Sequence, residues 1–169
     1  MTEDAVSSPV GTILMVALTI LLAALMLFIM FPSLFDAAVP SPIQITAVRH
    51  YDEQTGRLNF DSRVILVYKG EKRLNNTCLR AVFYRNEQQV PAVISTLNGY
   101  QFINTVHTGV QWIGGEGCRD GGWCPDQMVS IDLADHTFIP GDVVRLDVIE
   151  MPGNQVISRS RYRASQLGT

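Results

Sequence analysis

Three histidines, His50, His107 and His136, are the side chains best suited to acid–base or metal chemistry. His136 follows Asp132 and Asp135 in the phrase DLADHTF, and an imidazole beside two carboxylates is a donor set that divalent cations accept. Where a strand runs into a turn, however, such side chains more often cap the turn and face water. We therefore predict no metal ligand among them.

Catalysis has little support elsewhere in the chain. The serines lie in no G-x-S-x-G elbow, and no paired histidine motif accompanies them. The glycine-rich run GGEGCRDGGWC, residues 114–124, lacks the Gly-Lys-Ser/Thr ending with which a P-loop cradles phosphate. We expect no enzyme, no catalytic residue and no cofactor, although a pocket of convergent polar groups is invisible in a sequence.

Two cysteines of that run, Cys118 and Cys124, enclose the short segment RDGGW, whose glycines would let the sulfurs approach. Outside the cell we predict a disulfide between them, and the C-x5-C spacing argues against a zinc site. Cys78 either pairs with one of these cysteines or stays buried and reduced. We favour a stapled surface turn over an exposed contact loop with Trp112 or Trp123 as its anchor.

A possible modification site lies in the polar turn EKRLNNTC. Asn75-Asn76-Thr77 has the N-x-Ser/Thr pattern of an N-glycosylation acceptor. Such acceptors are surface features of external proteins. If the distal part of the chain is external, Asn75 is the residue expected to carry a glycan.

The last predicted strand carries Arg159, Arg161 and Arg163 on one face, because side chains alternate along a strand. A cationic stripe of this kind can meet a cell surface, nucleic acid or a neighbouring subunit. The Pro-Gly turn at 152–153 folds this strand back on residues 143–150, so Asp147 is expected opposite Arg159. We favour a solvated outer face that carboxylates neutralise locally.

Charge is distributed unevenly along the chain. The net charge is −3, with 13 Lys and Arg against 16 Asp and Glu. All the basic residues follow Pro42, and the chain beyond that residue is formally neutral. Binding of nucleic acid by bulk electrostatics needs a basic domain or a dense cationic stripe. We therefore predict no nucleic-acid partner.

The N-terminal part is apolar, and residues 5–35 carry no charged side chain. A helix from Val10 to Phe31 spans about 30 Å, the thickness of the hydrocarbon core of a membrane. It would be apolar on every face, so it cannot lie on the surface of a soluble domain. Pro9 suits a first helical turn, and Pro32 suits a stop or a kink.

Three uses of this segment can be compared. A secretory signal peptide has a basic leader and an A-x-A-like exit, whereas this leader reads MTED. A permanent single-pass anchor normally has Lys or Arg on its cytoplasmic side, and the chain has none before Arg49. A helix that waits in the membrane and then packs against copies of itself needs apolar residues on all sides. The third use fits the segment best.

The phrase AVSSPVGTILMVA, residues 5–17, resembles the signature of archaeal type IV pilins, in which a polar leader precedes A-V-S-P-V-x-G-x-I-L-M-V-A and a long apolar helix. The resemblance is looser beyond the helix, where LNFDSR at 58–63 and LNG at 97–99 are similar to surface pilins of methanogenic archaea. The chain departs from the family in Asp4, where Lys or Arg is usual, and in an additional serine before Pro9.

The resemblance implies cleavage between Ala5 and Val6 by a prepilin peptidase, with the helix retained in the cytoplasmic membrane until assembly. It implies a homo-oligomeric, extracellular helical filament, built by a dedicated assembly machinery and serving adhesion or cell-surface contact. The helix residues expected in the filament core are Val10, Ile13, Leu14, Leu18, Leu21, Leu22, Leu25 and Phe28.

Two alternatives stay open beside this hypothesis. One is a single-pass, membrane-anchored surface protein or minor pilin that does not polymerise. The other is an archaellin, the subunit of a swimming filament, although its helix usually begins with a Gly-rich phrase. A bacterial-type pilin would carry a Glu early in the helix, and no acid occurs between Asp4 and Asp36.

Beyond the helix the pattern changes to period two, which indicates strands. We expect a leader at 1–5, the helix at 6–35, a Pro-containing hinge at 36–42 and a β-sandwich at 43–169. The predicted strands begin at Ile43 and continue at 63–69, 79–85, 89–95, 101–104, 109–113, 128–133, 143–150 and 155–163. The predicted fold class is α+β, a long apolar helix followed by an antiparallel immunoglobulin-like β-sandwich, with an OB-like barrel as the alternative.

Overall fold

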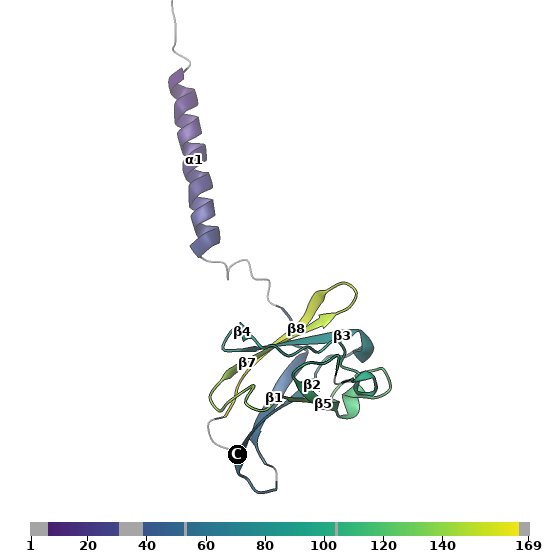
Figure 1. The fold of residues 1–169 in the computed structure, drawn as a ribbon. Helices are drawn as coiled ribbons and strands as arrows, with labels where there is room; N and C mark the ends of the chain where they lie inside the picture. The colour runs from purple at the N-terminus through teal and green to yellow at the C-terminus, as the bar shows by residue number, and fades with distance from the viewer. Residues whose placement is uncertain (1–6, 31–38, 53, 104, 166–169) are drawn as a thin grey trace, which may run out of the picture. The chain divides into compact units, whose positions relative to one another are not determined.

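The computed structural model describes residues 7–30, 39–52, 54–103 and 105–165 of the chain, which Figure 1 shows as a ribbon. The chain divides into two compact units, Met1–Ala38 and Val39–Thr169. The first contains one helix and the second contains two β-sheets. The predicted α+β fold class, with an apolar helix followed by an antiparallel sandwich, is therefore confirmed.

Helix α1 runs over Ser7–Met30, and its first and last turns contain no acidic or basic side chain. Pro9 lies in the first turn, where its missing N–H would have no helical acceptor. The hydroxyl of Thr12 donates to the carbonyl of Pro9 at 3.0 Å, and that of Thr19 donates to Val16 at 2.8 Å. These two polar side chains are thus satisfied within the helix and need no water.

The β-domain consists of two four-stranded sheets, and every strand pair is antiparallel. The first sheet has the order β1 (Ile43–Tyr51), β2 (Leu58–Tyr68), β6 (Met128–Leu133) and β5 (Val110–Gly114). The second has the order β4 (Gln88–Gln89), β3 (Leu79–Arg85), β7 (Val143–Glu150) and β8 (Gln155–Arg163). This order is the immunoglobulin arrangement, so the OB-like alternative is wrong.

The core lies between the two sheets and is formed by the inward-facing residues of both. Strand β1 alternates buried and exposed residues over much of its length, as a strand with one core face should. Phe83 from the second sheet meets Phe138 edge-on, with ring centroids 6.0 Å apart. Trp123 is fully buried and lies 5.9 Å from the ring of Tyr68. Burial of each such side chain stabilises the domain by about 2 kcal/mol.

Strand β1 also joins the two sheets at its N-terminal end. The hydroxyl of Ser158 on β8 accepts from the N–H of Ile43 and donates to the carbonyl of the same residue, both at 3.0 Å. Just before β1, the carbonyl of Pro40 accepts from the N–H of Arg159, and that of Pro42 accepts from Lys69. The described end of the predicted hinge is therefore bonded to β8 of the second sheet and to the residue that follows β2 of the first.

Two of the predicted strands are wrong. Of the segment predicted at 89–95, only Gln89 belongs to a strand, β4, and Ile94 forms an isolated bridge with Ala81. Pro91 has no N–H with which to continue the ladder. Residues 101–103 form no strand, and Asn104 lies outside the described residues. There the side chain of Asn98 accepts from the N–H of Tyr100 and caps the 3-10 helix η3, Gly99–Gln101.

Two arginines of the stripe on β8, Arg159 and Arg161, meet carboxylates as predicted. Asp147 pairs in register with Arg159, and the guanidinium donates to both carboxylate oxygens at 2.8 and 2.9 Å. Asp147 is 3% exposed, so this fork-to-fork pair is largely out of water. Arg161 meets Glu87 at 3.2 Å on the surface.

We predict that Arg159→Leu lowers the free energy of unfolding by about 2 kcal/mol, because it leaves the buried carboxylate of Asp147 without its bidentate partner. The measurement is urea denaturation of the full-length chain in detergent micelles. Arg161→Leu is the matched control, with an expected loss below about 0.5 kcal/mol, because its pair is exposed. Equal losses in the two variants would contradict the assignment.

Candidate functional site

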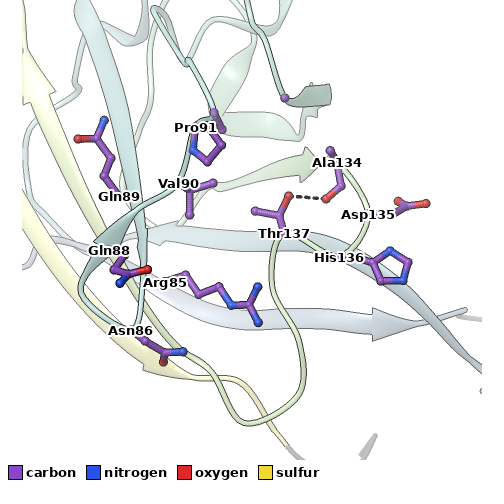
Figure 2. Close-up of a pocket in the computed structure, with 12 residues that line it drawn as sticks. Arg85, Asn86, Gln88, Gln89, Val90, Pro91, Ala134, Asp135, His136 and Thr137 are labelled. Atoms are coloured by element: carbon purple, nitrogen blue, oxygen red, sulfur yellow. Dashed lines mark hydrogen bonds between the residues drawn. The ribbon is translucent and has the colours of Figure 1, made fainter.

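A cavity of about 690 Å³ opens between the β3–β4 turn and the loop after β6 (Figure 2). Its walls combine charged, amide and small apolar side chains. The lining residues are Arg85, Asn86, Gln88, Gln89, Val90, Pro91, Ala92, Gly109, Ala134, Asp135, His136 and Thr137.

Several polar groups of this cavity are held by their own neighbours. Arg85 and Asn86 both bind the carboxylate of Asp142, at 2.7 and 2.8 Å. The hydroxyl of Thr137 donates to the carbonyl of Ala134, the bond that is dashed in Figure 2. The ring of His136 stacks on Phe60 with centroids 4.6 Å apart. None of these contacts joins a nucleophile to a base.

Asp132, Asp135 and His136 of the phrase DLADHTF do not come together as a set of metal ligands. Asp132 binds the guanidinium of Arg63 at 3.2 Å, and Asp135 accepts from the amide of Gln111 at 3.3 Å. Over the described ranges, no group of three His, Cys, Asp or Glu side chains is placed to hold a metal ion.

One contact that sequence reasoning missed joins a serine to a histidine. The hydroxyl of Ser95 lies 3.2 Å from Nε2 of His107, whose Nδ1 lies 3.0 Å from the carbonyl of Ile103. A serine hydroxyl, an imidazole and an acceptor at the second ring nitrogen, in this order, can activate the serine when a substrate pocket and an oxyanion hole adjoin it. Neither residue lines the 690 Å³ cavity, and His107 is 1% exposed beneath Phe102. The contact therefore secures a loop next to η3.

A pair of carboxylates on the first sheet is the most perturbed electrostatic feature of the domain. Asp61 and Asp132 interact across β2 and β6, with Arg63 at 3.7 and 3.2 Å from them. Desolvation, and then the hydrogen bond and the repulsion between the two carboxyl groups, raise the pKa of Asp61 to about 6. Nearby His50 is 1% exposed, and burial lowers its pKa.

The cysteines of the predicted staple lie in one loop but differ in exposure. Cys118 is 3% exposed and its Sγ lies 3.1 Å from the carbonyl of Gly115, whereas Cys124 and Cys78 are half-buried. Burial raises the pKa of the Cys118 thiol, which lowers its reactivity. None of the three cysteines forms a disulfide in the structure, and the disulfide between Cys118 and Cys124 stays a prediction.

Asn75 is exposed at the start of the 3-10 helix η2, Asn76–Cys78. Its side-chain oxygen accepts from the N–H of Thr77 at 3.1 Å, so the first and third residues of the sequon are held in one tight turn. Asn76, by contrast, is fully buried and donates to the carbonyl of Gly117. The geometry leaves the acceptor residue of the sequon at the surface.

The surface of α1 is the other candidate site. Seven of the residues expected in a filament core are between 55% and 71% exposed on the helix, namely Val10, Ile13, Leu14, Leu18, Leu21, Leu22 and Leu25. Phe28 belongs to the helix, but its side chain lies outside the described part, as do Ala5 and Val6, between which cleavage is predicted. The segment Pro9–Leu27 is 19 residues long with a mean hydropathy of 2.6, enough to cross a membrane.

Comparison with known proteins gives no family assignment, since no family model and no curated protein matches the chain. Among solved structures, the archaellum periplasmic stator protein complex FlaF and FlaG from Sulfolobus acidocaldarius matches at 12% identity and a TM-score of 0.43, over 75% of this chain and 90% of that one. The archaellum periplasmic stator protein FlaG from the same organism matches at 12% identity and a TM-score of 0.40, over 71% and 95%. At these identities and scores, the two neighbours assign no function to this chain.

We predict that Asp61→Asn raises the free energy of unfolding by about 1 kcal/mol at pH 7, because it removes a partly desolvated charge beside Asp132. The pKa of Asp61 in the folded state lies above its ordinary value of 3.8, so the free energy of unfolding falls as the pH rises from 3.8 to about 6 and this carboxyl group ionises. The gain in the free energy of unfolding from Asp61→Asn should therefore vanish near pH 3.8. Denaturation over this pH range checks it, and Asp126→Asn, whose carboxylate is 77% exposed beside Lys69, should show no such gain.

We predict that the surface-expressed chain carries glycan mass at Asn75. Asn75→Gln should remove that mass, whereas Thr77→Ser should keep it because the sequon survives. Intact-mass spectrometry of the wild type and both variants checks the prediction. An unchanged mass in Asn75→Gln would place any modification at another residue.

Proposed function

We propose that this chain is a structural subunit of an extracellular archaeal type IV pilus, stored in the membrane through α1 and polymerised through the same helix. The observation that carries the proposal is the surface of α1. It is apolar on every side, has no ionisable residue from Ser7 to Met30, and none of its membrane-length window is buried within the chain. Such a helix needs either lipid or other helices around it.

Both environments suit the polar groups of α1. The backbone bonds of a helix are internal, and the hydroxyls of Thr12 and Thr19 bind carbonyls of their own helix. Lipid tails or neighbouring apolar helices can therefore surround the same surface of α1. Transfer of α1 from lipid into a bundle of helices is driven by close packing and not by removal of apolar area from water. At Gly11 an added Cβ would meet nothing within 4 Å, so a second helix can approach the backbone there.

The β-domain supports the proposal by being complete without the helix. All of its core residues lie between Ile43 and Ala164, so it can keep one fold while the surroundings of α1 change. A subunit that uses one face to meet a different face of the next copy builds an open helical array. In such an array the helices form the core and the sandwiches form the outer layer that serves adhesion or cell contact.

The proposal includes processing and export. A prepilin peptidase would cut between Ala5 and Val6, and an assembly machinery would extract the subunit from the cytoplasmic membrane. The support is the resemblance of residues 5–17 to the pilin signature.

A second function is favoured by the length of the apolar window. Pro9–Leu27 alone can cross a bilayer, so α1 also suits the permanent anchor of a surface protein or minor pilin that does not polymerise. In that case the chain stays in the membrane fraction with its leader attached. The two functions differ in what surrounds α1 in its final state.

We predict that Leu21→Lys abolishes filament assembly while the β-domain remains folded, because a charge in the middle of α1 would be buried among apolar helices. Leu21→Met is the matched control and should assemble normally, since it conserves volume and polarity. Electron microscopy and intact mass of material sheared from cells are the measurements.

A sheared species that begins at Val6 supports the pilus subunit. If the sheared fraction lacked the chain and the membrane pellet held it from Met1, the anchored protein would be the correct function. Normal filaments from Leu21→Lys would overturn the role of α1 in the core.

A further inference from the structure

A small hollow of about 180 Å³ lies beside β5, the edge strand of the first sheet. None of its lining residues belongs to α1 or lines the 690 Å³ cavity. Two exposed aromatic side chains, Tyr100 and Trp112, line it together with Arg119. The hollow therefore places two π-systems and a cation at one sheet edge.

Trp112 owes its exposure to an irregularity in β5. The register with β6 shifts between Val110 and Trp112, and this puts the indole outward, opposite Asp132. The ring then lies over Gly114, where an added Cβ would be 1.9 Å from an indole carbon. Gly114 is buried, whereas Trp112 is 48% exposed. One part of the indole is thus fixed against the strand backbone while the rest faces solvent.

The other side of the hollow is also fixed by close packing. Tyr100 is 75% exposed on η3, and the neighbouring Gly99 packs against β5 and the buried Cys118. A Cβ on Gly99 would lie 2.8 Å from the Cys118 sulfur and 3.0 Å from the Ile113 carbonyl. The backbone beneath both aromatic rings is therefore held in place, so little ordering would be required on binding.

Arg119 gives the hollow its charge. It is exposed just after the 3-10 helix η4, Glu116–Cys118, and within the described part of the chain no carboxylate forms an ion pair with it. Arg161, Arg159 and Arg85, by comparison, each bind a carboxylate. A guanidinium without such a partner can bind an external carboxylate through two parallel hydrogen bonds.

We propose that this hollow binds one pyranose ring of an acidic, uronic-acid-containing polysaccharide. The C–H face of the sugar would stack on Trp112, because polarised C–H groups meet the negative face of an aromatic ring favourably. Tyr100 would close the other side, and Arg119 would bind the sugar carboxylate. A neutral sugar lacks the group for Arg119, and an anionic polypeptide lacks the rigid C–H face for Trp112.

The test uses the full-length chain in detergent micelles and the fluorescence of its two tryptophans. Trp123 is fully buried and Trp112 is exposed, so acrylamide should quench mainly Trp112. Alginate, a polyuronate, should protect Trp112 from the quencher. Dextran, which is neutral, and polyglutamate, which is anionic but not a sugar, should give little protection.

Variants identify the residues that make the site. The affinity for alginate, measured by calorimetry, should fall about tenfold or more in Arg119→Ala and Trp112→Ala, and less in Tyr100→Ala. Arg161→Ala and Val93→Ala are the matched controls, since they remove a cation and an apolar side chain of similar exposure elsewhere. Unchanged thermal unfolding shows that each variant is folded, and Trp112→Phe should retain part of the affinity.

Three results would overturn the proposal. Equal binding of alginate and polyglutamate would mean attraction by charge alone, and no protection at saturating alginate would mean that the hollow binds no such sugar. Protection that depends only on protein concentration would mean that a second copy of the chain covers the hollow. Each result is independent of filament formation, because the measurements are made on the chain in micelles.

Discussion

The internal hydrogen bonding of α1 is the constraint on which the organisation of this protein depends. A helix satisfies its backbone within one segment, so its outer surface can be wholly apolar without leaving a buried polar group unpaired. The hydroxyls of Thr12 and Thr19 follow the same rule by binding carbonyls one turn earlier. As a result, the part of α1 between its two ends places no demand for water or for a polar partner on its surroundings.

The β-domain solves a different problem, since its strands must pair with one another and bury only one face. Its two sheets share a core of aliphatic and aromatic side chains, and several of its charges lie around that core in pairs. Where a carboxylate is nearly buried, as at Asp147, a guanidinium meets it with two hydrogen bonds. Where two carboxylates meet, as at Asp61 and Asp132, desolvation and their mutual repulsion raise the pKa of Asp61. The electrostatics of the domain thus follow from which strands are neighbours.

Some of these features could be predicted from the sequence because their causes are local. The apolar run is visible as composition, and the strands at 79–85, 128–133, 143–150 and 155–163 are bounded by turn residues and coincide with β3, β6, β7 and β8. The pairing of Asp147 with Arg159 follows from the length of one hairpin. The strand expected at 89–95 fails because Pro91 interrupts the ladder, a local signal that the alternation of apolar residues outweighed.

Other features depend on contacts between segments far apart in the chain. The pair of Asp61 and Asp132 needs the register of β2 against β6, and the contact of Ser95 with His107 needs the path of a loop. The hollow beside β5 needs a register shift and the packing of η3 against η4. The sequence did single out Trp112 as a candidate contact residue, but it could not show that Gly114 lies beneath the ring.

The segment before β1 has a mechanical consequence. The carbonyls of Pro40 and Pro42 are bonded to β8 and to the residue after β2, which belong to different sheets. A tensile load that enters the β-domain from the N-terminal side is therefore divided between the two layers before it reaches the ladder of β1.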